Sequence, residues 1–280
     1  MERTLEGKVA FITGAARGQG RNHAVRMAER GADIIAVDVN RSLDTVAYPG
    51  ATPEDLAETV AQVEALDRRI VAAEADVRDV DAIKSIVDDG VAQLGRLDII
   101  LPNAGIATVA AAGDMTPKVW SEMIDINLTG AWNAVYAGLP HIRAHGEGGS
   151  IVFTGSVASH TPVPNLTHYV AAKHGVIGMM KTLALELGPE KIRVNAVSPT
   201  NVGTPMVINE FIMKLFMPDL ETPTQADAEA PDSPYRQANA IDVPWIESDD
   251  VTNAILYLVS DTGRYVTGIS LPVDAGFLLK

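Results

Sequence analysis

The 280-residue sequence contains no cysteine, so disulfide bonds and thiolate chemistry are excluded. Histidine, another common metal ligand, is scattered and never clusters with aspartate or glutamate at a metal-binding spacing. The six histidines are His23, His141, His145, His160, His168 and His174. We therefore predict no metal site, and we single out only His168, because it directly precedes a tyrosine.

Long apolar runs and an excess of positive charge are also missing. No run approaches the about 20 residues that a membrane-spanning helix needs, and no N-terminal stretch resembles a signal peptide. The net charge of −14 argues against nucleic acid and anionic membranes as partners. We expect a soluble, cytoplasmic protein that binds neither.

Apolar strand candidates alternate with helical patterns along the whole chain. The strands are expected at 8–13, 33–38, 70–75, 97–102, 150–155, 192–197 and 269–273. The helices are expected at 18–30, 53–67, 79–94, 117–144, 168–187 and 249–260. Thr52, Thr116 and Ser248 are the expected helix caps. Repeated units of this kind predict an α/β fold, with a doubly wound parallel sheet of about seven strands and helices on both faces.

A glycine-rich turn, Thr13 to Gly20, directly follows the first apolar strand and opens the first helix. Strand, glycine turn and helix form the context that a dinucleotide site requires, because glycine lets the backbone approach a pyrophosphate and the helix start attracts anions. Asp38 ends the next strand at the distance expected for an acid that binds an adenosine ribose. Its charge would repel a 2′-phosphate, which favours NAD over NADP. Arg17 and Arg41 are the counter-evidence, since either could grip a phosphate.

Tyr169 and Lys173 are four residues apart, so on a helix they share one face. The lysine charge favours the phenolate, and we expect the pKa of Tyr169 to fall from its usual value of about 10. Ser156, thirteen residues earlier, can hold a substrate oxygen beside the phenol. Such a trio suits proton transfer to or from an alcohol or carbonyl oxygen.

Two long segments interrupt the regular alternation. The loop 39–52 is longer than most βα connections and starts beside Asp38, so it is either a cover for the adenosine half of the dinucleotide or a plain surface insertion. The segment 203–247 follows the sixth strand at the edge where open α/β sheets bind ligands. Its apolar piece, 207–216, predicts a substrate lid, with ordinary core packing as the alternative.

These motifs together resemble the classical short-chain dehydrogenase/reductase family over essentially the whole chain. The matching positions are Thr13 to Gly20, Asp76-Val77, Asn103-Ala104-Gly105, Asn127, Ser156, Tyr169 and Lys173. The resemblance implies one Rossmann-type domain, 1–280. It also implies a dinucleotide site made by Gly14, Arg17, Gly18, Gln19, Gly20, Asp38, Asp76, Val77, Asn103, Ala104, Gly105, Tyr169, Lys173, Pro199, Val202 and Thr204. The family commonly has Pro-Gly where this chain has Pro199-Thr200, which leaves the turn at Thr200 open.

The resemblance also implies the catalytic roles. Tyr169 exchanges the proton, Lys173 lowers its pKa and binds the nicotinamide ribose, and Ser156 holds the substrate oxygen. Asn127 would hold a water that links Lys173 to solvent. The expected reaction interconverts an apolar secondary alcohol and its ketone, with NAD as cofactor. A 3-ketoacyl reductase and a non-catalytic dinucleotide sensor are the alternatives.

The insertion 39–52, the sequence Pro199 to Val202 and the segment 203–247 resemble the carveol-dehydrogenase-like, mycofactocin-coupled actinobacterial subfamily. That resemblance implies a bound NAD that exchanges poorly and is recycled by an external redox carrier. A homotetramer is also expected, packed through the helices 117–144 and 168–187. Gly175 and Gly178 would allow close approach of those helices, and the apolar end 277–279 would pack on a neighbour.

Overall fold

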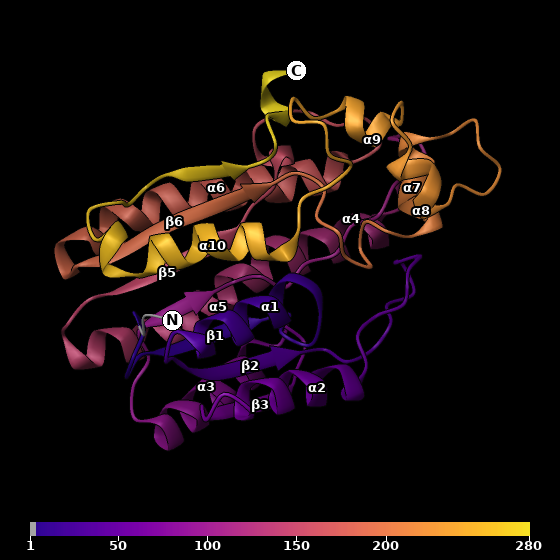
Figure 1. Ribbon diagram of the computed structural model, residues 1–280. Coiled ribbons are helices and arrows are strands. Elements are labelled where there is room, and N and C mark those ends of the chain that lie inside the picture. Colours follow the sequence, from indigo (N-terminus) through magenta and orange to yellow (C-terminus); the bar gives the residue numbers. More distant parts are fainter. Residues whose placement is uncertain (1–3) are drawn as a thin grey trace.

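The computed structural model describes residues 4–280 and contains one seven-stranded parallel sheet in the order β3-β2-β1-β4-β5-β6-β7 (Figure 1). The strands are β1 Val9–Thr13, β2 Asp33–Asp38, β3 Ile70–Glu74, β4 Ile99–Leu101, β5 Gly149–Thr154, β6 Ile192–Pro199 and β7 Ser270–Val273. Central strands such as β1 are apolar and fully buried, because helices cover both faces of the sheet. The fold class predicted from the sequence is confirmed.

The helices are α1 Gly18–Glu29, α2 Pro53–Glu64, α3 Val80–Leu94, α4 Pro117–Ile124, α5 Gly130–His145, α6 Thr167–Leu187, α7 Glu210–Phe216, α8 Gln225–Glu229, α9 Pro234–Gln237 and α10 Ser248–Val259. Of these, α7, α8 and α9 pack around Tyr235, apart from the helices that cover the two faces of the sheet. Helices α3, α5 and α6 share one hydrophobic core with the sheet, and α1, α2 and α10 share the other. Burying each large apolar side chain in these cores contributes about 1.5–3 kcal/mol to folding.

Local capping explains where several helices start. The hydroxyl of Thr52 accepts from the backbone N–H of Asp55, whose carboxylate in turn accepts from the Thr52 N–H. Thr116 caps α4 with its hydroxyl alone, which accepts from the backbone N–H of Val119. The expected cap at Ser248 is wrong by one residue, because Glu247 takes the capping position of α10.

The long helix expected at 117–144 is interrupted. Asp125–Thr129 forms a π-helical turn between α4 and α5. A π-turn shifts each backbone hydrogen bond by one residue and often marks a functional site. The π-helical turn Asp125–Thr129 lies within the range 117–144 and contains Asn127.

The sheet places its ligand edge at the carboxyl ends of the strands. The chain order reverses beside β1, whose neighbours are β2 and β4, and open α/β sheets bind ligands at such a point. The segment that carries α7, α8 and α9 extends over this edge, and so does the chain after β2 (Figure 1). Within residues 4–280, no helix is both long and apolar enough to cross a membrane.

Candidate functional site

The glycine turn after β1 forms the floor of a deep cavity. Gly14 has a φ of +68°, and a Cβ there would lie 2.8 Å from the Cα of Ala104. A side chain would therefore push two loops apart. Arg17 is the N-cap of α1, but within the described chain its side chain bonds no N–H of the helix start. Free N–H groups at the start of α1 thus face the cavity, which suits a pyrophosphate.

The same turn is joined to the loop after β4. The Asn103 amide donates to the carbonyls of Thr13 at 3.0 Å and Gly14 at 3.2 Å. The Thr13 hydroxyl accepts from the backbone N–H groups of Asn103 and Ala104, each at 3.1 Å. These bonds fix the two walls of the cavity relative to each other.

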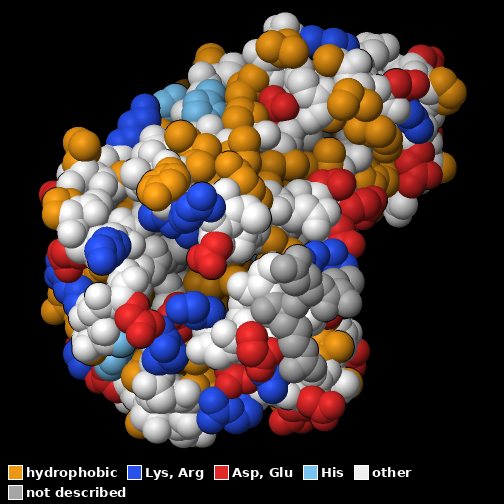
Figure 2. Space-filling model, turned by 60° about the vertical axis from the view of Figure 1, so that its left-hand side comes forward, with side chains coloured by type: hydrophobic (Ala, Val, Ile, Leu, Met, Phe, Trp, Pro, Cys, Tyr) orange, Lys and Arg blue, Asp and Glu red, His pale blue; other side chains and the backbone are white. Residues whose placement is uncertain are grey.

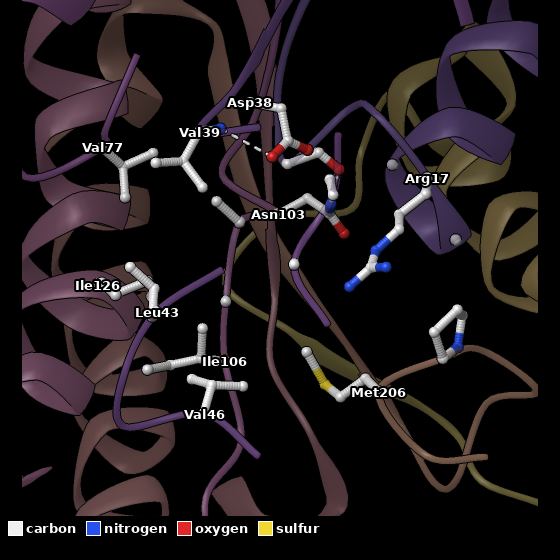
Figure 3. Close-up of a pocket in the computed structure, with 18 of the residues that line it drawn as sticks. Arg17, Asp38, Val39, Leu43, Val46, Val77, Asn103, Ile106, Ile126 and Met206 are labelled. Atoms are coloured by element: carbon white, nitrogen blue, oxygen red, sulfur yellow. Dashed lines mark hydrogen bonds between the residues drawn. The ribbon is translucent and has the colours of Figure 1, made fainter. Parts of the chain in front are cut away.

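Asp38 faces the cavity from the end of β2, where its carboxylate accepts from the N–H groups of Ala16 at 2.9 Å and Val39 at 2.8 Å (Figure 3). Burial raises the pKa of Asp38, and these bonds and the charge of Arg17 oppose the shift. The two arginines that could compete for a phosphate both have protein partners. Arg17 donates to the carbonyl of Pro49, and Arg41 pairs with Asp76 at 2.9 Å.

A charged cluster closes the far end of this cavity. Asp76 binds Arg78 at 2.6 Å, and Arg78 also binds Glu122 at 3.0 Å. Burial disfavours the charge of Asp76, but the bonds and charges of Arg78 and Arg41 outweigh it and lower the pKa of that carboxyl. Val77 lines the cavity next to this cluster.

The loop 39–52 lines the cavity and is bonded to the chain after β4. Leu43, Val46 and Tyr48 line the cavity, and Figure 3 shows the loop with Leu43 and Val46 near Ile106. The phenol oxygen of Tyr48 accepts from the backbone N–H of Ala107 at 3.1 Å. Tyr48 is buried, and burial raises its pKa to about 12. The loop therefore forms part of the cavity wall and is bonded to other segments of the protein.

A second cavity adjoins the first. The two share the lining residues Gln19, Asn103, Gly105, Ile106, Thr204 and Met206. Ser156, Tyr169 and Lys173 all line the second cavity. A ligand that spans both cavities would therefore place one end beside this trio.

The lysine and the tyrosine meet as their spacing predicts. The Lys173 Nζ lies 5.6 Å from the centre of the Tyr169 ring and donates to the carbonyl of Thr154 at 2.7 Å. The expected fall in the tyrosine pKa is wrong for the chain alone. Burial raises the pKa of Tyr169, although a hydrogen bond from Ser156 opposes the shift. Burial also lowers the pKa of Lys173 to about 8, which weakens the cation that was expected to act on the phenol.

Asn127 lies in the π-turn beside this trio. Its side chain accepts from the N–H of Ile106 at 2.8 Å and donates to the carbonyl of Ile106 at 2.9 Å. A Cβ at Gly105 would lie 3.1 Å from the Asn127 Oδ1 and 3.8 Å from the Lys173 Nζ. The lack of a side chain at Gly105 therefore leaves room where the asparagine and the lysine converge.

The remaining walls of the second cavity are mostly apolar. Val207, Ile212, Leu215 and Phe216 come from the segment 203–247, which here forms short helices packed around the buried Tyr235. Phe277 also lines the cavity. The chain end therefore folds back over its own site, while Leu279 is 85% exposed and the packing of 277–279 on a neighbouring subunit stays a prediction.

The turn that departs from the family pattern is regular. Thr200 is not among the residues with positive φ, and its hydroxyl donates to Asn239 at 3.3 Å. The chain then pairs Val202 with Ile246 in an isolated parallel bridge. Threonine therefore fits this position without backbone strain.

All the expected dinucleotide-binding residues line one or both cavities, and Asn127 lies just behind them. Tyr48, which lines the first cavity, was not predicted from the sequence as a site residue. Ile106, whose backbone bonds the Asn127 side chain, was not predicted either. An aromatic residue in an unusually long loop was the available signal for Tyr48, while nothing in the sequence around Ile106 indicates its role.

Comparison with known proteins agrees with this geometry. Residues 8–214 match the family model described as short chain dehydrogenase. The chain belongs to this family. It is 50% identical to the (-)-trans-carveol dehydrogenase of Rhodococcus erythropolis, over 99% of both chains. A carveol dehydrogenase structure from Mycobacterium avium in complex with NAD is 56% identical, covers 100% of both chains and has a TM-score of 0.96.

A second solved relative is a short chain dehydrogenase from Mycobacterium paratuberculosis bound to NAD. It is 47% identical, covers 99% of this chain and 100% of its own, and has a TM-score of 0.90. The fold of the short-chain dehydrogenases therefore extends over the full chain, including the loop 39–52 and the segment 203–247.

Proposed function

We propose that this chain is a cytoplasmic, NAD-dependent dehydrogenase that interconverts an apolar, terpenoid-like secondary alcohol and its ketone. The observation that carries the proposal is the meeting of Ser156, Tyr169 and Lys173 in a largely apolar cavity that opens into the cavity of Asp38. The carveol dehydrogenase name of the Rhodococcus erythropolis relative supports the substrate class. The two NAD-bound mycobacterial structures support the cofactor.

The chain's residues fit the dinucleotide at each of its parts. The glycine turn and the start of α1 suit the pyrophosphate, Asp38 suits the ribose hydroxyls, and Val77 with Asp76 suits the adenine. Pro199, Val202 and Thr204 line the end where the nicotinamide would lie. When bound, NAD supplies the acceptor or donor of the hydride.

The protein side chains handle the proton. In the oxidative direction Tyr169 takes the hydroxyl proton of the alcohol, and Ser156 donates a hydrogen bond to the same oxygen. Lys173 binds the nicotinamide ribose and stabilises the phenolate. A proton leaves through Lys173 and a water held at the π-turn of Asn127. The apolar helix α7 covers the substrate as part of a lid over 203–247 and excludes solvent.

The loop 39–52 supports a further part of the proposal, namely that NAD stays bound between turnovers. Arg41, Tyr48 and Pro49 hold the loop to both sides of the cavity. A cofactor beneath it exchanges slowly, so an external redox carrier such as mycofactocin would reoxidise it in place. The 3-ketoacyl reductase alternative needs NADPH, which Asp38 disfavours.

A homotetramer is part of the same proposal. Trp132 and Tyr136 on α5 have exposed fractions of 45% and 54%, and Figure 2 shows hydrophobic side chains gathered over the upper half of one face. Gly175 contributes inside the subunit, because a Cβ there would lie 2.9 Å from Leu128. Sedimentation would test this part, and a monomer would refute it without affecting the chemistry.

The main test combines cofactor identification with a substrate screen. The purified protein is dialysed and denatured, and the released dinucleotide is identified by mass spectrometry. Cyclic and aliphatic secondary alcohols are then screened with an artificial electron acceptor and, separately, with added NAD. We expect retained NAD and faster oxidation of cyclic apolar alcohols with the artificial acceptor. A preference for free NADPH, or no oxidation of any alcohol, would refute the proposal.

A further inference from the structure

The polar side chains around the substrate cavity differ in whether the protein already satisfies them. The Thr154 hydroxyl donates to Asn103, and the Lys173 ammonium donates to the carbonyl of Thr154. The Thr204 hydroxyl donates to the carbonyl of Val202. Each of these groups has a partner within the protein, and the Lys173 ammonium keeps further donors for the roles proposed above.

Asn201 is different. It lines the substrate cavity, and among residues 4–280 neither atom of its side-chain amide makes a hydrogen bond. Its Nδ2 is buried without a partner. Buried polar atoms are nearly always paired, so an unpaired amide in a ligand cavity indicates a partner that the ligand supplies.

The backbone directs this amide. The Asn201 carbonyl accepts from the N–H of Ile246 at 3.0 Å, and Val202 pairs with Ile246 in a parallel bridge. The bridge fixes the backbone of Asn201 beside the substrate cavity, which Thr200 and Val202 also line. The Thr200 hydroxyl is bonded to Asn239 and Val202 is apolar, so the Asn201 amide is the unpaired polar side chain of this stretch.

Gln19 carries a second amide with an unpaired atom. Its Oε1 is also buried and unpaired within the described chain, but Gln19 lines both cavities, next to the glycine turn. Asn201 lines only the second cavity, together with the apolar Ile212, Leu215 and Phe216 of the segment 203–247. The Gln19 amide is therefore at the glycine turn, and the Asn201 amide is in the cavity that would hold the substrate.

We propose that Asn201 is a specificity-determining residue that hydrogen-bonds a second oxygen of the substrate, on a carbon other than the one that is oxidised. This inference rests on the proposed function. Half a turn of the amide exchanges its oxygen and nitrogen, so it can accept from a hydroxyl or donate to a carbonyl. The preferred substrate is then an apolar ring or chain with two oxygen functions, not a plain hydrocarbon alcohol.

The test uses matched pairs of substrates and Asn201→Leu, which has a similar size but no hydrogen-bonding group. Cyclohexanols with a hydroxyl or oxo group at the 2-, 3- or 4-position are compared with the corresponding methyl compounds. In the native enzyme we expect a higher kcat/KM for one oxygenated isomer than for its methyl partner. Asn201→Leu should lower that ratio about tenfold, as expected for the loss of one hydrogen bond.

Gln62→Leu is the matched control, because it removes an amide on α2 that lines neither cavity and should not affect the ratio. Asn201→Ala is the second variant if Asn201→Leu does not fold, and it should lower the ratio likewise. An unchanged ratio in a folded Asn201 variant would overturn this inference alone. Equal loss with both substrates together with release of NAD would also overturn it, by assigning the amide to the dinucleotide. No alcohol oxidation by the native enzyme would refute the proposed function itself.

Discussion

Asp38 is the residue that we expect to distinguish the two nicotinamide dinucleotides most directly. Two backbone N–H groups bond its carboxylate where it lines the first cavity, so its charge would oppose an incoming 2′-phosphate there. Arg17 and Arg41, which could have offset its charge, are engaged by Pro49 and Asp76. We therefore expect the selectivity to depend on this one negative charge.

Removing that charge should change the cofactor preference. We expect Asp38→Ser to weaken NAD binding about tenfold, since bonds to two ribose hydroxyls are lost, and to improve NADP binding. Calorimetric titration of protein freed of its dinucleotide measures both. Asp44→Ser is the control, because Asp44 is in the same loop with a side chain 92% exposed. An unchanged NAD to NADP ratio in Asp38→Ser would contradict this role.

Tyr169 and Lys173 show which properties of single residues could be predicted from the sequence. The four-residue spacing of Tyr169 and Lys173 predicted their proximity correctly, because helix geometry alone determines it. The pKa of Tyr169 was predicted in the wrong direction, because burial depends on which distant segments cover the helix. An oxidised nicotinamide, when bound, would add a positive charge that favours the phenolate.

At the scale of elements, the loop 39–52 is the feature that sets this chain apart from a minimal dinucleotide fold. Tyr48 bonds the loop after β4, and Thr45 bonds Glu122 on α4. The sequence showed the loop's length and its start beside Asp38, but its far contacts depend on residues more than fifty positions away. The π-turn at Asp125–Thr129 was missed for a related reason, since its residues also suit an α-helix.

Weakening the loop's attachment should speed cofactor exchange. Tyr48→Phe removes the acceptor for the Ala107 N–H but keeps the ring, so we expect NAD to dissociate several-fold faster, as one hydrogen bond contributes about 0.5–1.5 kcal/mol. Exchange of bound NAD for isotope-labelled NAD gives the rate. The control is Tyr265→Phe, which alters a tyrosine that is 89% exposed. Equal exchange rates in both variants would show that this bond does not hold the cover.

At the scale of the whole molecule, α1 and α10 pack together on one face of the sheet around a buried histidine. His23 on α1 is fully buried, and its Nδ1 lies 2.7 Å from the Thr252 hydroxyl on α10. Burial lowers the pKa of His23 from 6.5 to about 3. The unfolded chain therefore binds a proton at this residue over a range of pH in which the folded chain does not.

This difference makes the free energy of unfolding depend on pH. The stabilisation from neutral His23 is complete above pH 6.5 and is lost as the pH falls towards 3. We expect His23→Gln to reduce the slope of unfolding free energy against pH in this window by up to about 1.4 kcal/mol per pH unit. Urea unfolding at several pH values measures it, with the exposed His174→Gln as control. Identical slopes in the native protein and His23→Gln would be inconsistent with a buried neutral imidazole.

The parallel sheet of about seven strands and the helices on both of its faces follow from buried apolar strands alternating with helical segments, and these were predicted correctly. The position of the segment 203–247 at the ligand edge was also predicted, but its division into α7, α8 and α9 and the course of the chain end were not, because they depend on long-range packing. Phe277 reaches the substrate cavity only once β7 has paired with β6 and the chain turns back over the ligand edge.

Proton transfer by the Tyr169 phenol is the central step of the proposed alcohol oxidation. The turnover of Tyr169→Phe is therefore the most direct test of that proposal. We expect oxidation of the best alcohol to fall about 10²- to 10⁴-fold, while the bound NAD and the thermal unfolding temperature stay at their native values. Tyr265→Phe, at a tyrosine that is 89% exposed, should keep full activity. Near-native turnover by Tyr169→Phe with NAD in place would contradict the account.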